Sequence, residues 1–203
     1  MLGPALLLTN DAEFLDDDFD GIRFIGESGK RLSTLKTGRF GVGFNTAYNV
    51  TDYPSLLSRQ WMLCFDPHGD AIAERPEDHG RGFVLAELRS SYPSWLQSFE
   101  AGGLQAGQDD HNGTIFRLPL RTSKRALASE ISKEPFDGKT FREIVKAMIE
   151  EGPKMLLFTR NVLDLTIDEI PQKGGFAPTA SINFHRKSRG GETLTRSRLL
   201  FGR

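Results

Sequence analysis

Three glycines lie within residues 38–43. A segment with glycines this closely spaced is the part of the sequence best suited to bind an anion. The stretch Gly38–Phe44 reads GRFGVGF. Glycine allows the main chain to approach a ligand without an intervening side chain. Because the first N–H groups of a helix have no partner within the helix, those of residues 41–44 could donate hydrogen bonds to phosphate oxygens if a helix follows.

The order of the glycines separates the known phosphate-binding schemes. A dinucleotide fingerprint needs G-x-G-x-x-G after a strand, but the order here is G-x-x-G-x-G, and the preceding residues 32–37 are poor strand material. A Walker A loop closes with Gly-Lys-Ser/Thr, whereas Gly43 is followed by Phe-Asn. The spacing therefore disfavours the first scheme and excludes the second. A glycine loop that enters a helix remains, because Phe44, Ala47 and Tyr48 recur at helical spacing.

The other reactive side chains indicate no second site. Cys64 is the single cysteine and lies in an apolar run, which predicts a buried strand residue and excludes an internal disulfide or a cluster of thiolate ligands. The four histidines are far apart and lack the spacing of metal ligands. The aspartates at residues 16–18 precede an apolar periodic segment, which is typical of a helix N-terminus. We therefore expect no metal held by protein side chains alone.

The elements that must position the glycine loop have a mixed order. Expected strands are residues 4–9, 60–65, 82–88, 114–121, 163–168 and 180–186, and expected helices begin at the aspartate run, after Phe40, at Pro93 and at Thr140. The clearest helix spans residues 140–151, where Thr140 and Glu143 suit a capping box and Gly152-Pro153 would end it. Adjacent strands mixed with helices predict an α+β sandwich in which helices cover one face of a mostly antiparallel sheet.

Composition narrows the class of partner. The chain has 203 residues, with 26 Lys+Arg against 27 Asp+Glu and a net charge of −1. This balance gives no overall field that would attract nucleic acid or an anionic membrane. No stretch approaches the roughly 20 apolar residues of a membrane helix, so a cytoplasmic location is expected. A strand that begins at once at Pro4, and a terminal pattern that stops at Arg203, suggest a fragment of a larger protein.

Several blocks of the sequence resemble a known family. Residues 38–48 are similar to the glycine-box helix of the heat-shock-90 chaperones, within the GHKL ATPase class. The blocks PALLLTNDAEF, TDYPSLLS, FDPH and NGTIFRLPLR resemble the sacsin-type branch and fall in its order over residues 3–170. The resemblance implies the two-layer GHKL sandwich. It also implies a nucleotide-binding core over residues 1–125 that lacks its first helix, followed by a helix plus β-hairpin extension over residues 126–203.

The same resemblance implies an ATP site. Asp11 is similar to the family aspartate that accepts a hydrogen bond from the adenine amino group, and Asn10 remains an alternative for this role. Thr114 resembles the residue that completes the adenine contacts, and Lys30 lies in a connection that resembles the family's lid. The implied nucleotide contacts are Asp11, Lys30, Gly38, Arg39, Phe40, Gly41, Val42, Gly43, Phe44 and Thr114.

One family element has no match in this chain. It is an E-x-x-x-N helix before the strand that starts at Pro4, whose glutamate polarises the attacking water and whose asparagine binds magnesium. We therefore expect no catalytic residue and no metal ligand here, although ATP and Mg²⁺ are implied by the family. Two hypotheses follow. The chain is an ATP-binding module of a sacsin-like, heat-shock-90-like chaperone, with ATP, ADP, client proteins and co-chaperones as partners, or it is an interaction scaffold that works without nucleotide.

Overall fold

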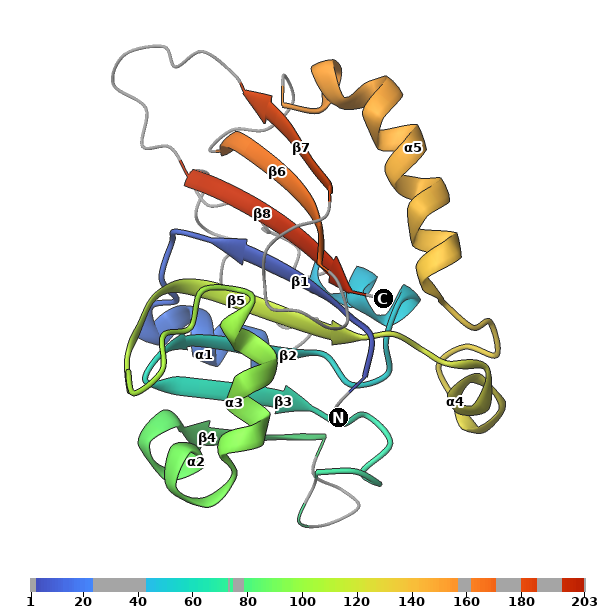
Figure 1. Ribbon diagram of the computed structural model, residues 1–203. Helices are drawn as coiled ribbons and strands as arrows, with labels where there is room; N and C mark the ends of the chain where they lie inside the picture. The colour runs from blue at the N-terminus through green and yellow to red at the C-terminus, as the bar shows by residue number, and fades with distance from the viewer. Residues whose placement is uncertain are drawn as a thin grey trace.

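One mixed sheet organises the protein. The computed structural model describes residues 3–23, 43–72, 74, 79–156, 162–170, 180–185 and 195–202. Within them, eight strands lie in the order β4-β3-β2-β5-β1-β8-β6-β7 (Figure 1). They are β1 (Ala5–Asn10), β2 (Ser55–Arg59), β3 (Trp61–Phe65), β4 (Gly80–Val84), β5 (His111–Pro119), β6 (Val162–Ile170), β7 (Ala180–His185) and β8 (Thr195–Gly202). Neighbouring strands are antiparallel except β6 and β8, which are parallel.

Helices pack on both faces of this sheet. They are α1 (Asp16–Arg23), the 3₁₀ helix η2 (Phe44–Asn49), α2 (Leu85–Ser91), α3 (Pro93–Glu100), α4 (Ser123–Ala128) and α5 (Gly138–Met155). Successive residues of a strand point to opposite faces. Leu57 accordingly packs in one buried cluster with Leu88 and Phe99 of α2 and α3, whereas Leu56 packs in another with Phe19 of α1. Figure 1 shows α3 in front of the strands and α1 behind them.

This arrangement confirms an α+β fold with a mixed sheet but corrects the expectation that helices cover a single face. The physical reason is that β2 and β3 are apolar on both sides: Leu57 and Met62 face α2 and α3, while Leu56 and Leu63 face α1. Both faces of a strand with two apolar sides must be covered. The division of the chain at residue 125 stays a prediction, and the sheet runs across it, since β8 pairs with β1.

Two local expectations were wrong. The strand β2 was missed, because all of Ser55–Ser58 is buried and a strand buried on both faces shows no alternation. The strand expected over residues 82–88 ends at Val84, and the chain turns directly into α2. The apolar Leu85 and Leu88 that suggested a strand are instead the buried side of that helix.

The longest helix was located correctly, but its ends differ from the prediction. Asp137 caps α5, and its carboxylate accepts a hydrogen bond from the N–H of Thr140 at 2.8 Å. Thr140 therefore lies inside the first turn and is not the cap. Residues 152 and 153 lie within the helix, which continues to Met155. Among the described residues, none of the helices has the length and apolar character required to cross a membrane.

Candidate functional site

The pairing of β1 with β5 brings two of the predicted adenine contacts together. Asn10 lies opposite Thr114 in the antiparallel register. The Thr114 side chain is completely buried, and its hydroxyl donates a hydrogen bond to the carbonyl of Ala12 at 2.7 Å. Ser58 of β2 completes the group, because its hydroxyl donates to the carbonyl of Gly113 at 2.6 Å. The end of β1 is therefore fixed to β5 and β2 by side-chain hydrogen bonds.

Asn10 and Asp11 have different roles at this strand end. The side-chain oxygen of Asn10 accepts a hydrogen bond from the N–H of Ala12 at 3.0 Å, which forms a local turn. Asp11 is exposed and lines a groove of about 530 Å³. Both residues line this groove, but Asp11 is exposed whereas Asn10 is half-buried.

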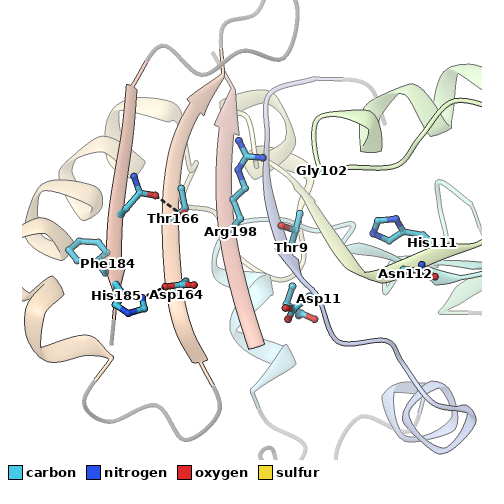
Figure 2. Close-up of a pocket in the computed structure, with 12 residues that line it drawn as sticks. Thr9, Asp11, Gly102, His111, Asn112, Asp164, Thr166, Phe184, His185 and Arg198 are labelled. Carbon is cyan, nitrogen blue, oxygen red and sulfur yellow. Dashed lines mark hydrogen bonds and ion pairs between the residues drawn. The ribbon is translucent and has the colours of Figure 1, made fainter. Parts of the chain in front are cut away.

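The groove beside Asp11 is polar (Figure 2). Its floor is the outer half of the sheet, where Thr166 of β6 donates a hydrogen bond to Asn183 of β7 at 2.8 Å. Asp164 and His185 are paired on the same two strands. Such self-paired polar side chains are typical of the solvated face of an antiparallel sheet. The remaining residues that line this groove are Thr9, Asn10, Gly102, His111, Asn112, Phe184 and Arg198.

A second, apolar cavity of about 630 Å³ lies on the opposite face of the sheet. Its floor consists of side chains from β1, β5 and β8. Side chains from α1, η2 and α5 form its walls. It is lined by Leu6, Leu8, Phe14, Asp18, Ile22, Gly43, Phe44, Thr46, Ala47, Asn49, Val50, Phe116, Leu118, Phe136, Phe141, Ile144 and Leu199. Its volume falls within the range of small-molecule sites in proteins, about 300–1,000 Å³.

Gly43 stands at the edge of this cavity in an ordinary backbone conformation. Its φ of −60° and ψ of −41° are those of a right-handed helix, which any residue can adopt. Among the described residues, no atom lies within 4 Å of a Cβ added at Gly43. Neither backbone strain nor crowding by these residues therefore requires glycine here. None of the described residues blocks the approach of a ligand to the main chain at Gly43.

The structure places the predicted site residues unequally. Thr114 lies beside the turn that carries Asp11. Gly43 and Phe44 line the apolar cavity, whereas Asp11 lines the polar groove on the other face. The predicted residues Lys30, Gly38, Arg39, Phe40, Gly41 and Val42 lie outside the described residues. Within the described part of the chain, the adenine and phosphate halves of the predicted site are therefore not in one cavity.

Sequence reasoning missed a buried ionic cluster around Asp52. The side chains of Asp52 and Arg121 are both 0% exposed, and the Arg121 Nε donates to the Asp52 Oδ1 at 2.6 Å. Arg125 donates to the other carboxylate oxygen of Asp52 at 3.0 Å. The Arg125 guanidinium also stacks over the ring of Tyr53, 4.3 Å from its centroid. No local pattern in the sequence pairs Asp52 with Arg121, because the two residues are 69 positions apart in the chain.

The electrostatics of the cluster favour an ionised Asp52. Burial by itself raises the pKa of the Asp52 carboxyl, but hydrogen bonds from Arg121, Arg125 and Ser129 outweigh burial, so the pKa is lowered from its ordinary value.

In contrast, burial raises the pKa of the Cys64 thiol to about 12, although the nearby Arg117 charge acts the other way. Cys64 is thus an inert core residue, as the sequence predicted.

Comparisons with known proteins identify the relatives of this chain. Residues 1–181 match the family model described as the Sacsin domain. The human protein sacsin (Homo sapiens) is 33% identical to this chain over 177 residues, which cover 85% of this chain and 4% of the human protein. The chain therefore spans a small fraction of the length of that curated relative.

Proposed function

The chain belongs to the Sacsin domain family, and from this membership we propose that it is an ATP-binding module of a sacsin-like chaperone with the GHKL fold. The observation that carries the proposal is the apolar cavity of about 630 Å³ walled by Gly43 and Phe44. An adenine ring needs an apolar slot with few polar contacts, and phosphates need a main chain without side chains in the way. The apolar cavity meets both conditions, while the predicted adenine contact Asp11 lines the groove on the other face.

The residues present fit a nucleotide better than they fit a metal ion. The open space at Gly43 suits the approach of a phosphate. Among the described residues, no group of three His, Cys, Asp or Glu side chains is arranged to hold a metal ion. We therefore assign Mg²⁺ no ligands from this part of the chain. The proposal concerns nucleotide binding in the cytoplasm, with client proteins and co-chaperones as the proposed protein partners.

A specific observation favours a second candidate function, an interaction scaffold that keeps the fold without nucleotide. Asp11 and Gly43 line separate cavities on opposite faces of the sheet. The Thr114 hydroxyl is also already satisfied by the carbonyl of Ala12. An ATP site of the proposed kind needs Asp11 and Gly43 to contact one ligand. The two candidates therefore differ in whether nucleotide changes the stability of the protein.

Titration of ADP, ATP and GTP, with the thermal midpoint as readout, separates the candidates. A ligand that binds only the folded state stabilises it by RT ln(1 + [L]/Kd), about 2.7 kcal/mol at a hundredfold excess over Kd. We expect ADP and ATP to raise the thermal midpoint and GTP to leave it unchanged. The reason is that the carboxylate of Asp11, the predicted adenine contact, accepts a hydrogen bond from the adenine amino group, whereas guanine has a carbonyl at that position. No shift with any nucleotide would favour the scaffold.

The variant Gly43→Ala sharpens this test. Because Gly43 has a helical φ and open space around it, alanine should leave the fold intact or stabilise it by about 0.4–1 kcal/mol. The added methyl should nevertheless reduce the midpoint shift caused by ADP. The matched control is Gly3→Ala, since Gly3 also has no atom within 4 Å of an added Cβ but does not line the cavity. If ADP raises the thermal midpoint equally in Gly43→Ala and Gly3→Ala, Gly43 does not contact the nucleotide.

A further inference from the structure

One wall of the apolar cavity depends on a short element whose side chains are only partly buried. The 3₁₀ helix η2 and its two flanking residues contribute Gly43, Phe44, Thr46, Ala47, Asn49 and Val50 to the lining. None of the residues of η2 is buried, and no side chain caps its N-terminus. A 3₁₀ helix of six residues is longer than usual, and its hydrogen bonds have poor geometry. Contacts from outside the helix must therefore hold this wall in place.

The two ends of η2 are held differently. At the N-terminal end, the ring of Phe44 packs on the ring of Phe65, with centroids 4.9 Å apart. At the C-terminal end, the carbonyls accept hydrogen bonds from the Arg121 guanidinium. Its Nη1 donates to the carbonyl of Asn49 at 3.3 Å, and its Nη2 donates to the carbonyls of Tyr48 and Thr51.

The same guanidinium is fixed on its other side. Its Nε donates to Asp52 at 2.6 Å, and its Nη1 also donates to the carbonyl of Glu134 at 3.4 Å. Arg121 lies two residues after the end of β5, and β5 supplies Phe116 and Leu118 to the floor of the cavity. Arg121 thus joins the floor strand to the wall through a planar group with five N–H donors.

We propose that Arg121 is the positioning residue of the cavity wall: its guanidinium holds the C-terminal end of η2 against the end of β5, and so sets the shape that a ligand meets at Ala47, Asn49 and Val50. Lysine cannot replace it, because an ammonium is a point charge with three donors and cannot reach Asp52 and four separate carbonyls in one plane. The expected effect of Arg121 on ligand affinity rests on the function proposed above. The expected effect of Arg121 on the order of η2 is independent of that function.

The test compares Arg121→Lys with a control variant that destabilises a distant part of the core. Leu88→Ala is suitable, because Leu88 is buried in α2 within the cluster on the opposite face and does not line the cavity. Hydrogen exchange is measured for both variants and the parent protein under conditions where all are folded. We expect exchange over residues 43–52 to quicken at least about tenfold in Arg121→Lys only, with β5 unchanged in the same variant.

Titration with ADP forms the second arm. In Arg121→Lys, the Kd for ADP should rise about tenfold, equivalent to ~1.4 kcal/mol, while Leu88→Ala should bind like the parent. If the parent does not bind ADP but residues 43–52 lose protection, the proposed function fails and the positioning role stands. Unchanged protection of residues 43–52 in Arg121→Lys would overturn the positioning role. If Arg121→Lys does not fold, Asp52→Asn is the second variant. We then expect faster exchange over residues 43–52 and weaker ADP binding, both by smaller factors than in Arg121→Lys.

Discussion

Arg117 and Arg121 stand four positions apart near the end of one strand, and both side chains are buried, yet their surroundings differ. Arg121 donates hydrogen bonds to the Asp52 carboxylate and to four backbone carbonyls. Arg117 is 4% exposed and donates to the carbonyl of Gly3 at 3.2 Å. Within the described part of the chain, no carboxylate is paired with Arg117. Burial therefore lowers the pKa of Arg117 to about 10, although the nearby Cys64 acts in the opposite direction.

The difference shows that burial of a charge does not by itself indicate a structural role. A buried ion is costly to remove from water, and only good partners offset this cost. The Arg121 guanidinium has a full set of partners from two segments of the chain, residues 48–52 and residue 134. Among the described residues, the Arg117 guanidinium has one neutral hydrogen-bond partner, the carbonyl of Gly3. We therefore expect the protein to depend strongly on Arg121 and to tolerate the loss of Arg117.

The largest expected effect is that of Arg121→Met. Removing one partner of a buried ion pair leaves the other uncompensated, which typically costs about 3–5 kcal/mol. Asp52 would lose its closest cation, and the carbonyls of Tyr48, Asn49 and Thr51 would lose a donor. Urea unfolding should show a loss of this size in the free energy of unfolding. A loss below about 1 kcal/mol would mean that Arg125 alone can satisfy Asp52.

A smaller effect is expected from Asp52→Asn, and it should depend on pH. Asparagine keeps the shape but loses the charge, which should cost about 1.5–3 kcal/mol near neutral pH, the usual contribution of hydrogen bonds to a charged group. The pKa of Asp52 is lowered in the folded state. Its contribution to stability is therefore fully present above the unfolded pKa of about 3.9 and is lost as the pH falls through the lower, folded pKa.

The measurement for Asp52 is a series of urea unfolding curves from neutral pH down to the lowest pH at which the parent protein remains folded. The difference between the parent and Asp52→Asn should be constant above about pH 5 and should shrink below about pH 4. A difference that stays constant through the acid range would show that the carboxylate charge is not what stabilises the cluster.

The smallest expected effect is that of Arg117→Met. Replacing a buried, poorly paired cation by an apolar side chain of similar length is often neutral or stabilising, so the free energy of unfolding should stay constant or rise by about 1 kcal/mol. The backbone of this position remains fixed, because the carbonyl of Arg117 accepts a hydrogen bond from Ser55 regardless of the side chain. A loss above about 2 kcal/mol would show that Arg117 has an ionic partner and would remove the contrast with Arg121.

The alternation of residues 114–121 predicted a strand, and β5 confirms it. The same alternation puts Arg117 and Arg121 on the face opposite Phe116, Leu118 and Leu120, and the structure buries both arginines. The alternation does not predict this burial, because a period of two says which side chains share a face but not what covers that face. The apolar pattern of β2 and β3 on both sides recruits a second layer of helices, and this layer is visible only when the strands are placed side by side.

The candidate site shows the same limit. Local sequence was sufficient to locate the glycine stretch and the helical spacing after it, and Gly43 and Phe44 do line a cavity. The family resemblance assigns both Asp11 and Thr114 to the adenine contacts, and Thr114 lies beside the turn that carries Asp11. Nothing in the local sequence predicts that Asp11 lines the groove on one face of the sheet while Gly43 lines the apolar cavity on the other face.

The sequence by itself determined the elements whose signals are local: the first strand, the helix at the aspartate run, the long helix near residue 140 and the glycine stretch. These follow from side-chain periodicity and turn chemistry within a few residues. Only the tertiary structure decided that β8 lies between β1 and β6, and that Arg121 meets Asp52 across a separation of 69 residues. Such pairings depend on which distant segments bury one another's apolar faces and satisfy one another's polar groups, and no local pattern carries that information.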